Sequence, residues 1–92
     1  MLDELLILKK IKGGDIKAFE ELFRRYYFPL CCYAAGITGQ MEVAEEIVEE
    51  LFYVLWKERE RLQIFQSVKS YLYRATRNQS LQYCEHEEVR NR

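Results

Sequence analysis

Apolar residues recur every three or four positions along almost the whole chain, and few residues interrupt them. Side chains at this spacing share one face of an α-helix. The 92 residues include only four glycines and one proline, which leaves little room for the many turns of a β-protein. The sequence therefore predicts an all-α fold, a bundle of three to four helices that forms one domain over residues 1–92.

A pair of glycines separates the first two expected helices. Gly13-Gly14 ends a short first helix, and Asp15 is suited to cap the start of the second. The second helix should end in the stretch bracketed by Gly36 and Gly39 and bend at Pro29, which removes a backbone donor and clashes with the preceding turn. The apolar faces of these helices consist of Leu2, Leu5, Leu6, Leu8 and Ile11, and of Phe19, Leu22, Phe23, Tyr26, Leu30, Tyr33, Ala34 and Ile37.

Two further helices are expected in the second half of the chain. The third should run from near Met41 to about Leu62. The fourth should start after Ser67, a suitable N-cap, and fray after Tyr83 in the charged tail. Residues 63–66 form the expected connection. The residues expected to be buried are Ala44, Ile47, Val48, Leu51, Phe52 and Leu55 in the third helix, and Val68, Tyr71, Leu72 and Ala75 in the fourth.

The cysteines and the N-terminus favour a cytoplasmic protein. Cys31, Cys32 and Cys84 are odd in number and have neither a disulfide framework nor the Cys-x-x-Cys spacing of a zinc site. We expect reduced and mostly packed thiols. The acidic opening Met1-Leu2-Asp3-Glu4 is unlike a secretory signal, and no apolar run approaches the ~20 residues of a membrane span.

The formal net charge is -1, but the charges are unevenly distributed. Between Gln40 and Trp56 there are five glutamates and no lysine or arginine. The stretch from Lys57 to Cys84 contains six basic residues and two glutamates. A chain with one acidic and one basic surface can bind two partners of opposite charge, although its net charge is close to zero.

The glutamates of the third helix lie three and four residues apart, so several point the same way. The glutamates near the start of the helix interact favourably with the helix dipole, so a solvent-exposed face without a partner accounts for them. Glu49 and Glu50 lie roughly two to three turns in, gain little from the dipole, and suit a basic protein partner. From the spacing alone, both interpretations stay open. The five residues are Glu42, Glu45, Glu46, Glu49 and Glu50.

The outer face of the fourth helix combines cations, a tyrosine and small hydroxyls. If Val68, Leu72 and Ala75 face inward, Arg74 lies at the margin of that face. Cations neutralise phosphates, and a tyrosine that stacks on an unpaired base contributes roughly 1–3 kcal/mol, so this face suits a nucleic-acid strand. A solvated helix with partly packed tyrosines is the alternative. The residues placed on the outer face are Lys69, Tyr73, Thr76, Arg77 and Ser80.

No catalytic or cofactor site is indicated. The single histidine, His86, lies between Glu85 and Glu87 in the charged tail, and no glycine-rich loop suits a phosphate. No serine or cysteine has a recognisable base nearby in the sequence. The two Glu-x-x-His motifs of a dimetal bundle are absent. We therefore expect a binding domain with no cofactor and no metal, and not an enzyme.

Three segments of the chain carry motifs that occur together in a known family. Residues 10–37 contain a Gly-Asp turn, an Ala-Phe pair and a tyrosine-rich helix with a proline. Residues 44–56 read Ala-Glu-Glu-Ile-Val-Glu-Glu-Leu-Phe-Tyr-Val-Leu-Trp, and residues 67–83 run from Ser-Val-Lys-Ser-Tyr to Leu-Gln-Tyr. In this order the segments resemble region 2, the N-terminal domain of bacterial RNA polymerase sigma factors of the extracytoplasmic-function class. The resemblance implies a transcription initiation domain that binds core RNA polymerase and recognises and melts the minus-ten promoter element.

The resemblance also implies roles for individual residues. The middle segment implies binding to the coiled-coil clamp helices of the largest polymerase subunit through Glu46, Ile47, Glu49, Glu50 and Phe52. The last segment implies binding to promoter DNA, mainly the non-template single strand, through Lys69, Tyr71, Tyr73, Arg74, Arg77 and Asn78. Helical phase places Tyr71 near the core, so we rank Tyr73 above it as the stacking residue. The resemblance also implies an anti-sigma factor as a further partner.

The tail and the extent of the sequence differ from a complete factor of this class. Glu85, Glu87 and Glu88 occupy positions where basic residues are usual in the family. A second, helix-turn-helix domain for the minus-thirty-five element is missing from these 92 residues, so we expect a fragment of a longer factor. The alternative, from a different class, is a helical adaptor that sequesters another regulator through the acidic face and does not bind DNA.

Overall fold

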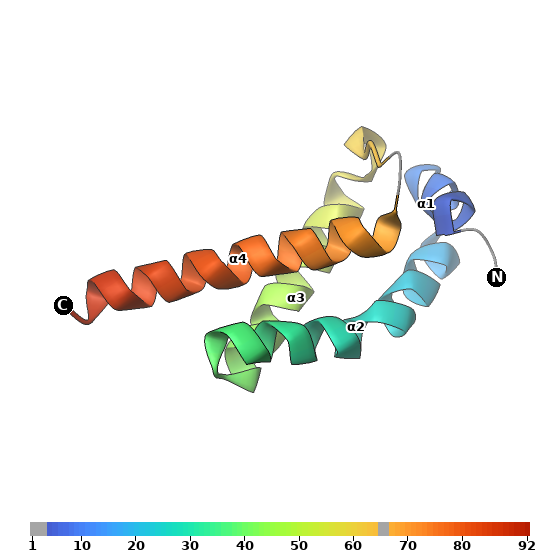
Figure 1. The fold of residues 1–92 in the computed structure, drawn as a ribbon. Coiled ribbons are helices and arrows are strands. Elements are labelled where there is room, and N and C mark those ends of the chain that lie inside the picture. The colour runs from blue at the N-terminus through green and yellow to red at the C-terminus, as the bar shows by residue number, and fades with distance from the viewer. Residues whose placement is uncertain (1–3, 65–66) are drawn as a thin grey trace.

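The computed structural model describes residues 4–64 and 67–92, and these form helices joined by short connections (Figure 1). Within that part the order is α1 (Glu4–Lys12), α2 (Ile16–Thr38), α3 (Met41–Lys57), the short 3-10 helix η1 (Arg59–Arg61) and α4 (Val68–Arg90). The prediction of an all-α fold is confirmed. Leu2 and residues 65–66, which the sequence placed in the first helix and in the last connection, lie outside the described residues.

The turn between α1 and α2 has the predicted form. Gly14 takes a positive φ of 91°, a conformation in which a side chain would be strained. Asp15 caps α2, since its Oδ1 accepts hydrogen bonds from the backbone N–H groups of Lys17 at 3.0 Å and Ala18 at 3.2 Å. Pro29 lies inside α2, and the axis of the helix changes direction near its middle (Figure 1).

The end of α3 differs from the prediction, because the helix stops at Lys57 and not near Leu62. The N–H of Glu58 still reaches the carbonyl of Val54 at 2.8 Å, after which the chain forms η1. Leu62 then adopts an extended conformation and is buried in the core. Burial of this leucine outweighs the helix preference of the charged segment before it.

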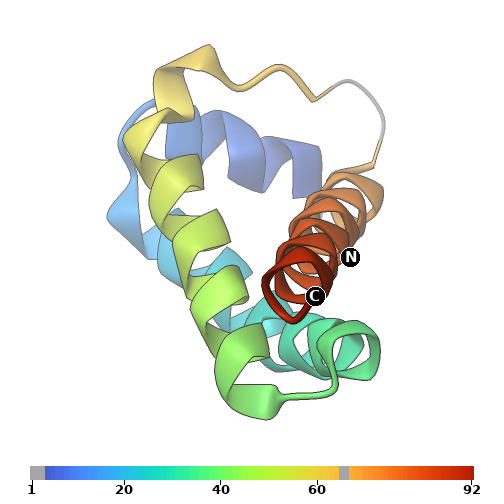
Figure 2. The same cartoon turned by 90° about the vertical axis from the view of Figure 1, so that its left-hand side faces the viewer.

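The core lies where α2, α3 and α4 meet, with α1 packed against α2 and α4. Figure 2, which looks nearly along α4, shows α4 at one side, with the other helices to its left and below it. Aromatic rings from α2 and α3 join the core, and Phe23 meets Phe52 edge-on with ring centroids 5.0 Å apart. The fully buried large apolar side chains are Ile11, Leu22, Leu30, Val48, Phe52 and Leu72.

The buried face of α4 also differs from the prediction. Val68, Leu72, Thr76 and Ser80 form a buried column with four-residue spacing, whereas Tyr71 is 37% exposed. Thr76 and Ser80 were expected on the outer face, but both are fully buried, and their hydroxyls make no hydrogen bond within the described residues. The buried column thus contains small polar residues that an apolar pattern does not detect.

The C-terminal end of α4 is longer and better formed than expected. The helix continues past Tyr83 to Arg90, and its last turns project beyond the other helices (Figure 1). This projection gives the molecule extents of 45 × 23 × 21 Å.

The three cysteines differ in exposure. Cys31 is buried, Cys84 is partly buried and Cys32 is exposed, which agrees with the expectation of mostly packed thiols. Burial raises the pKa of the Cys31 thiol, which keeps it protonated and unreactive near neutral pH. No helix within the described residues has the length and apolar character to cross a membrane.

Candidate functional site

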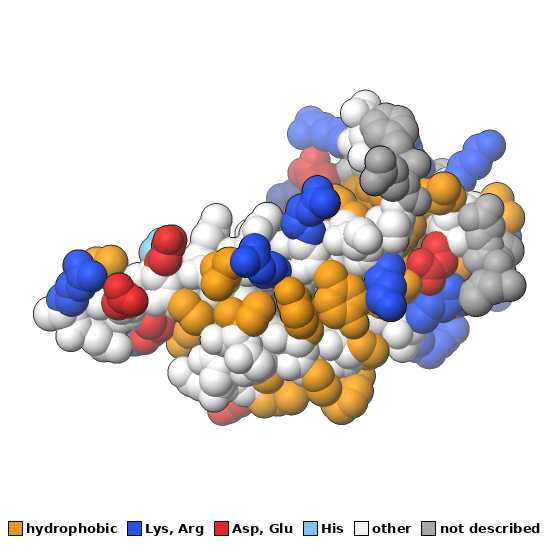
Figure 3. Space-filling view, in the orientation of Figure 1, with side chains coloured by type: hydrophobic (Ala, Val, Ile, Leu, Met, Phe, Trp, Pro, Cys, Tyr) orange, Lys and Arg blue, Asp and Glu red, His pale blue; other side chains and the backbone are white. Residues whose placement is uncertain are grey.

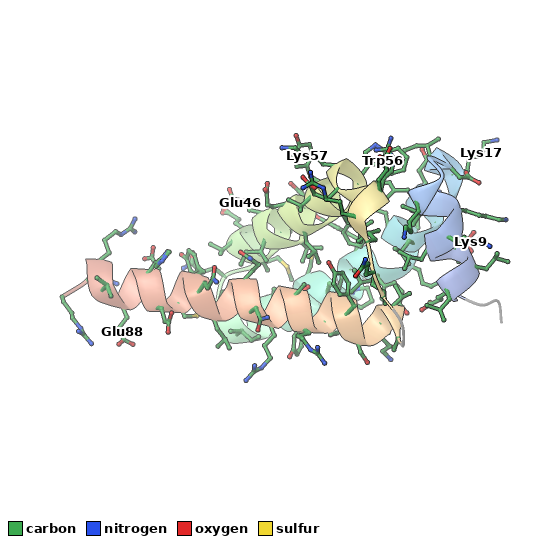
Figure 4. All side chains as sticks on the ribbon, turned by 90° about the horizontal axis from the view of Figure 1, so that it is seen from above. Lys9, Lys17, Glu46, Trp56, Lys57 and Glu88 are labelled. Atoms are coloured by element: carbon green, nitrogen blue, oxygen red, sulfur yellow. The ribbon has the colours of Figure 1, made fainter. Side chains whose placement is uncertain are left out.

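The glutamates of α3 form an exposed acidic surface. Glu46, Glu49 and Glu50 are exposed, and Figure 4 shows where Glu46 lies on α3. Within the described residues, the ion pairs involve other carboxylates and none of the five glutamates of α3. These charges are therefore available to a basic partner without first breaking an internal ion pair.

Phe52 does not belong to this surface, so the prediction that it contacts a partner is wrong. Its side chain is 1% exposed and packs edge-on against Phe19 and Phe23, with ring centroids 6.1 and 5.0 Å apart. Helical phase explains this, because Phe52 lies four residues after the buried Val48. Ile47 is partly buried and lines a groove between α3 and α4, together with Glu46, Glu50, Leu51, Val54 and Gln79.

Tyr53 is an exposed aromatic residue of the acidic surface that the sequence reasoning missed. Its side chain is 59% exposed, and the Lys57 ammonium lies 5.9 Å from the centre of its ring. Tyr53 follows Glu49 by four residues, so both occupy the same side of α3. No role was predicted for Tyr53 from the sequence, although the four-residue step from Glu49 could have identified it.

A side chain of α2 also reaches the acidic surface. The hydroxyl of Tyr27 donates a hydrogen bond of 3.0 Å to Oε2 of Glu49. Burial, followed by the contacts with Cys31 and Glu49, raises the pKa of Tyr27 well above its ordinary value of 10.0. The phenol therefore remains a hydrogen-bond donor at any physiological pH.

The six residues expected to bind DNA separate into two rows along α4. Lys69, Tyr73 and Arg77 are four residues apart and form the first row, on the side of α2. The second row consists of Tyr71, Arg74 and Asn78. Tyr71 and Tyr73 lie about 160° apart around the helix axis, whereas Arg74 and Arg77, three residues apart, are neighbours on its surface. Figure 3 shows lysine and arginine side chains along α4 beside a band of hydrophobic side chains at the junction with α2.

The two tyrosines of these rows differ in how free their rings are. Tyr73 is partly buried, and Tyr33 of α2 packs against it at a centroid distance of 5.1 Å and an interplanar angle of 68°. Tyr71 is 37% exposed and has no aromatic neighbour within the described residues. The placement of Tyr71 near the core is therefore wrong, and Tyr71 has the ring better able to stack on a base.

Comparison with protein families identifies one match that covers most of the chain. The family model described as Sigma-70 region 2 matches residues 22–88. A search among curated proteins finds no significant match.

Among solved structures, the chain is similar to one described as "NMR structure of the complex formed by an engineered region 2 of sigmaE in complex with GTAAAA". The TM-score is 0.80 at 21% sequence identity, and the match covers 97% of this chain and 93% of that one. At this identity the likeness establishes a shared four-helix fold.

Proposed function

Because the chain belongs to the sigma-70 region 2 family, a non-enzymatic family of transcription initiation domains, we propose that it binds core RNA polymerase through α3 and the minus-ten promoter element through α4. The observation that carries this proposal is the separation of two exposed surfaces on one small bundle, an acidic one on α3 and a basic, aromatic one on α4. The three matching segments of the sequence favour the extracytoplasmic-function class.

The polymerase side of the proposal assigns Glu46, Glu49 and Glu50 to the clamp helices of the largest subunit. Tyr53 replaces Phe52 as the aromatic residue of this surface, because only Tyr53 is exposed. The partly buried Ile47 contributes the apolar floor of the adjoining groove. Basic groups on the polymerase would meet carboxylates that have no competing ion pair within the described residues.

The DNA side of the proposal assigns the unpaired non-template strand to the row formed by Tyr71, Arg74 and Asn78. The freer ring of Tyr71 stacks on a base, and Arg74 neutralises a phosphate. Lys69 and Arg77, in the other row, contribute long-range attraction. A domain that binds the single strand more tightly than the duplex shifts promoter DNA toward the open state without hydrolysis. The similar sigmaE region 2, solved in complex with GTAAAA, supports this assignment.

The polymerase side is tested by reversing charge in the double variant Glu46→Lys, Glu50→Lys. We expect the affinity for core polymerase to fall by at least tenfold while the melting temperature stays unchanged, since both residues are exposed. The matched control is Glu20→Lys with Glu85→Lys, two exposed glutamates that lie outside the acidic surface. Equal binding by the charge-reversed protein and this control would remove α3 from the interface.

The DNA side is tested by the affinity for a single-stranded minus-ten oligonucleotide. We expect Tyr71→Ala to weaken binding by about five- to 150-fold, the equivalent of one lost base stack of roughly 1–3 kcal/mol. Arg74→Ala should reduce the slope of log affinity against log salt by about 0.7. The control is Gln82→Ala, an exposed position beyond the two rows. If neither variant changes binding, the adaptor without DNA contacts becomes the better description.

A further inference from the structure

Two adjacent tyrosines on α2 bind carboxylates of two different helices. The Tyr26 hydroxyl donates hydrogen bonds of 2.8 Å to both oxygens of Glu4 on α1. The Tyr27 hydroxyl donates its hydrogen bond of 3.0 Å to Glu49 on α3. In the sequence this adjacent pair suggests a site as well as core packing, with core packing favoured, and the contact with Glu4 agrees with a packing role. The contact with Glu49 is different, because Glu49 lies on the acidic surface.

The core fixes the position of the Tyr27 ring. This ring stacks on Phe23 with centroids 4.8 Å apart and an interplanar angle of 19°. Phe23 in turn meets Phe52 edge-on, and Phe52 is fully buried. The hydroxyl at the end of a ring held in this way has little freedom to move, so the carboxylate that it binds is held as well.

Glu49 retains most of its capacity to bind a partner. Only Oε2 accepts the hydrogen bond from Tyr27, and Oε1 has no hydrogen-bond partner within the described residues. An ionised carboxylate has about four acceptor sites, so one bond leaves most of them open. No cation pairs with Glu49 in the described part of the chain. The side chain is therefore oriented but not neutralised.

We propose that Tyr27 is a positioning residue for polymerase binding, which holds the Glu49 carboxylate ready for a basic partner. This inference rests on the proposed function, in which the acidic surface contacts the polymerase. It extends the functional surface from α3 to α2. A free glutamate loses conformational entropy when an interface fixes its side chain. The hydrogen bond from Tyr27 already restricts the Glu49 side chain, so less entropy is lost when the partner binds.

The direct test is Tyr27→Phe, which keeps the ring and removes only the hydroxyl. We expect the affinity for core polymerase to fall about three- to tenfold, the cost of fixing one such side chain on binding. The matched control is Tyr26→Phe, which removes the neighbouring hydroxyl and its bond to Glu4. That control should leave polymerase affinity unchanged, and melting temperatures of both variants report on the fold.

A double-mutant cycle separates positioning from a structural role. In a Glu49→Ala background the Tyr27→Phe change should cause no further loss, because there is no carboxylate left to hold. A second variant, Glu49→Asp, keeps the charge but draws the carboxylate back from the hydroxyl. It should lose about as much affinity as Tyr27→Phe, and adding Tyr27→Phe should change nothing more.

The outcomes distinguish this inference from the proposed function. Unchanged or tighter polymerase binding by Tyr27→Phe overturns the positioning role, as does a loss of equal size in the Glu49→Ala background. In both cases the acidic surface stands if Glu46→Lys with Glu50→Lys still abolishes binding. Full binding by that charge-reversed protein overturns the proposed function itself.

Discussion

Phe52 and Tyr53 are neighbours in the sequence, but α3 places the first in the core and the second in solvent, with exposed fractions of 1% and 59%. We expect Phe52→Ala to lower the free energy of unfolding by about 3–5 kcal/mol, because a large buried ring leaves a cavity. Tyr53→Ala should change it by less than about 0.5 kcal/mol. Urea unfolding followed by circular dichroism measures both values.

The same two variants separate stability from binding at the level of single residues. Tyr53→Ala should weaken polymerase binding without loss of fold, whereas Phe52→Ala should reduce binding only in proportion to the unfolded fraction. A Phe52→Ala protein that is fully stable yet fails to bind polymerase would return Phe52 to the interface and contradict its burial.

At the level of elements, α4 combines a packed half with a projecting half. The packed half buries the column from Val68 to Ser80, whereas the projecting turns end in the exposed ion pair of Glu88 with Arg92 at 3.2 Å. Exposed pairs of this kind contribute only a few tenths of a kcal/mol. We expect the amides of residues 85–90 to exchange with solvent at least about tenfold faster than those of residues 70–80, because local opening there breaks few contacts.

Hydrogen exchange followed by NMR tests this difference along α4. The amides of α3 near Val48 serve as the internal reference, since this part of the core opens only with the whole domain. Uniform protection along all of α4 would contradict the expectation and indicate that the projecting turns are held by contacts beyond the ion pairs.

Helix boundaries were predictable from the sequence wherever a single residue type, such as an N-cap or a glycine, favours a helix end. The glycines after α1 and the caps Asp15 and Ser67 lie where predicted, because such preferences are local. The end of α3 was not predictable, since the charged residues after Lys57 all favour a helix, and only the burial of Leu62 stops it. Such an effect depends on tertiary contacts.

The candidate site shows the same division between local and tertiary information. The exposure of Glu46, Glu49 and Glu50 follows from charge and spacing. The side of α4 that is buried does not follow from them, because its buried column contains Thr76 and Ser80, which a search for apolar residues passes over. The bond between Tyr27 and Glu49 joins residues 22 positions apart on different helices, so no spacing within one helix indicates it.

For the whole molecule, the net charge of -1 hides a separation of opposite charges. In Figure 4, Lys9 and Lys17 lie at the end of the molecule opposite to Glu88, and Glu46 lies on a third side. Each charged surface can therefore attract its own partner, and at physiological salt a charge acts over about 8 Å.

The stability of the whole domain should depend on pH through the tyrosine that joins α1 to α2. Burial, followed by the hydrogen bond to Glu4, raises the pKa of Tyr26 from 10.0 to about 12. The unfolded chain therefore releases this proton at a lower pH than the folded chain does. The contribution to the free energy of unfolding is fully present below pH 10 and is lost as the pH rises from about 10 toward 12. Urea midpoints measured at pH 8, 10 and 11 report this loss.

The comparison of variants assigns that loss to one hydroxyl. The informative quantity is the difference in stability between the wild-type protein and Tyr26→Phe, because every contribution that the two proteins share cancels in it. The variant should be less stable at pH 8 by about 1 kcal/mol, the usual cost of a lost hydrogen bond, and this gap should shrink by pH 11. Tyr71→Phe, which changes an exposed tyrosine, should follow the wild-type curve at a constant offset. A gap between Tyr26→Phe and the wild type that stays constant through pH 11 would show that the buried phenol does not couple folding to pH.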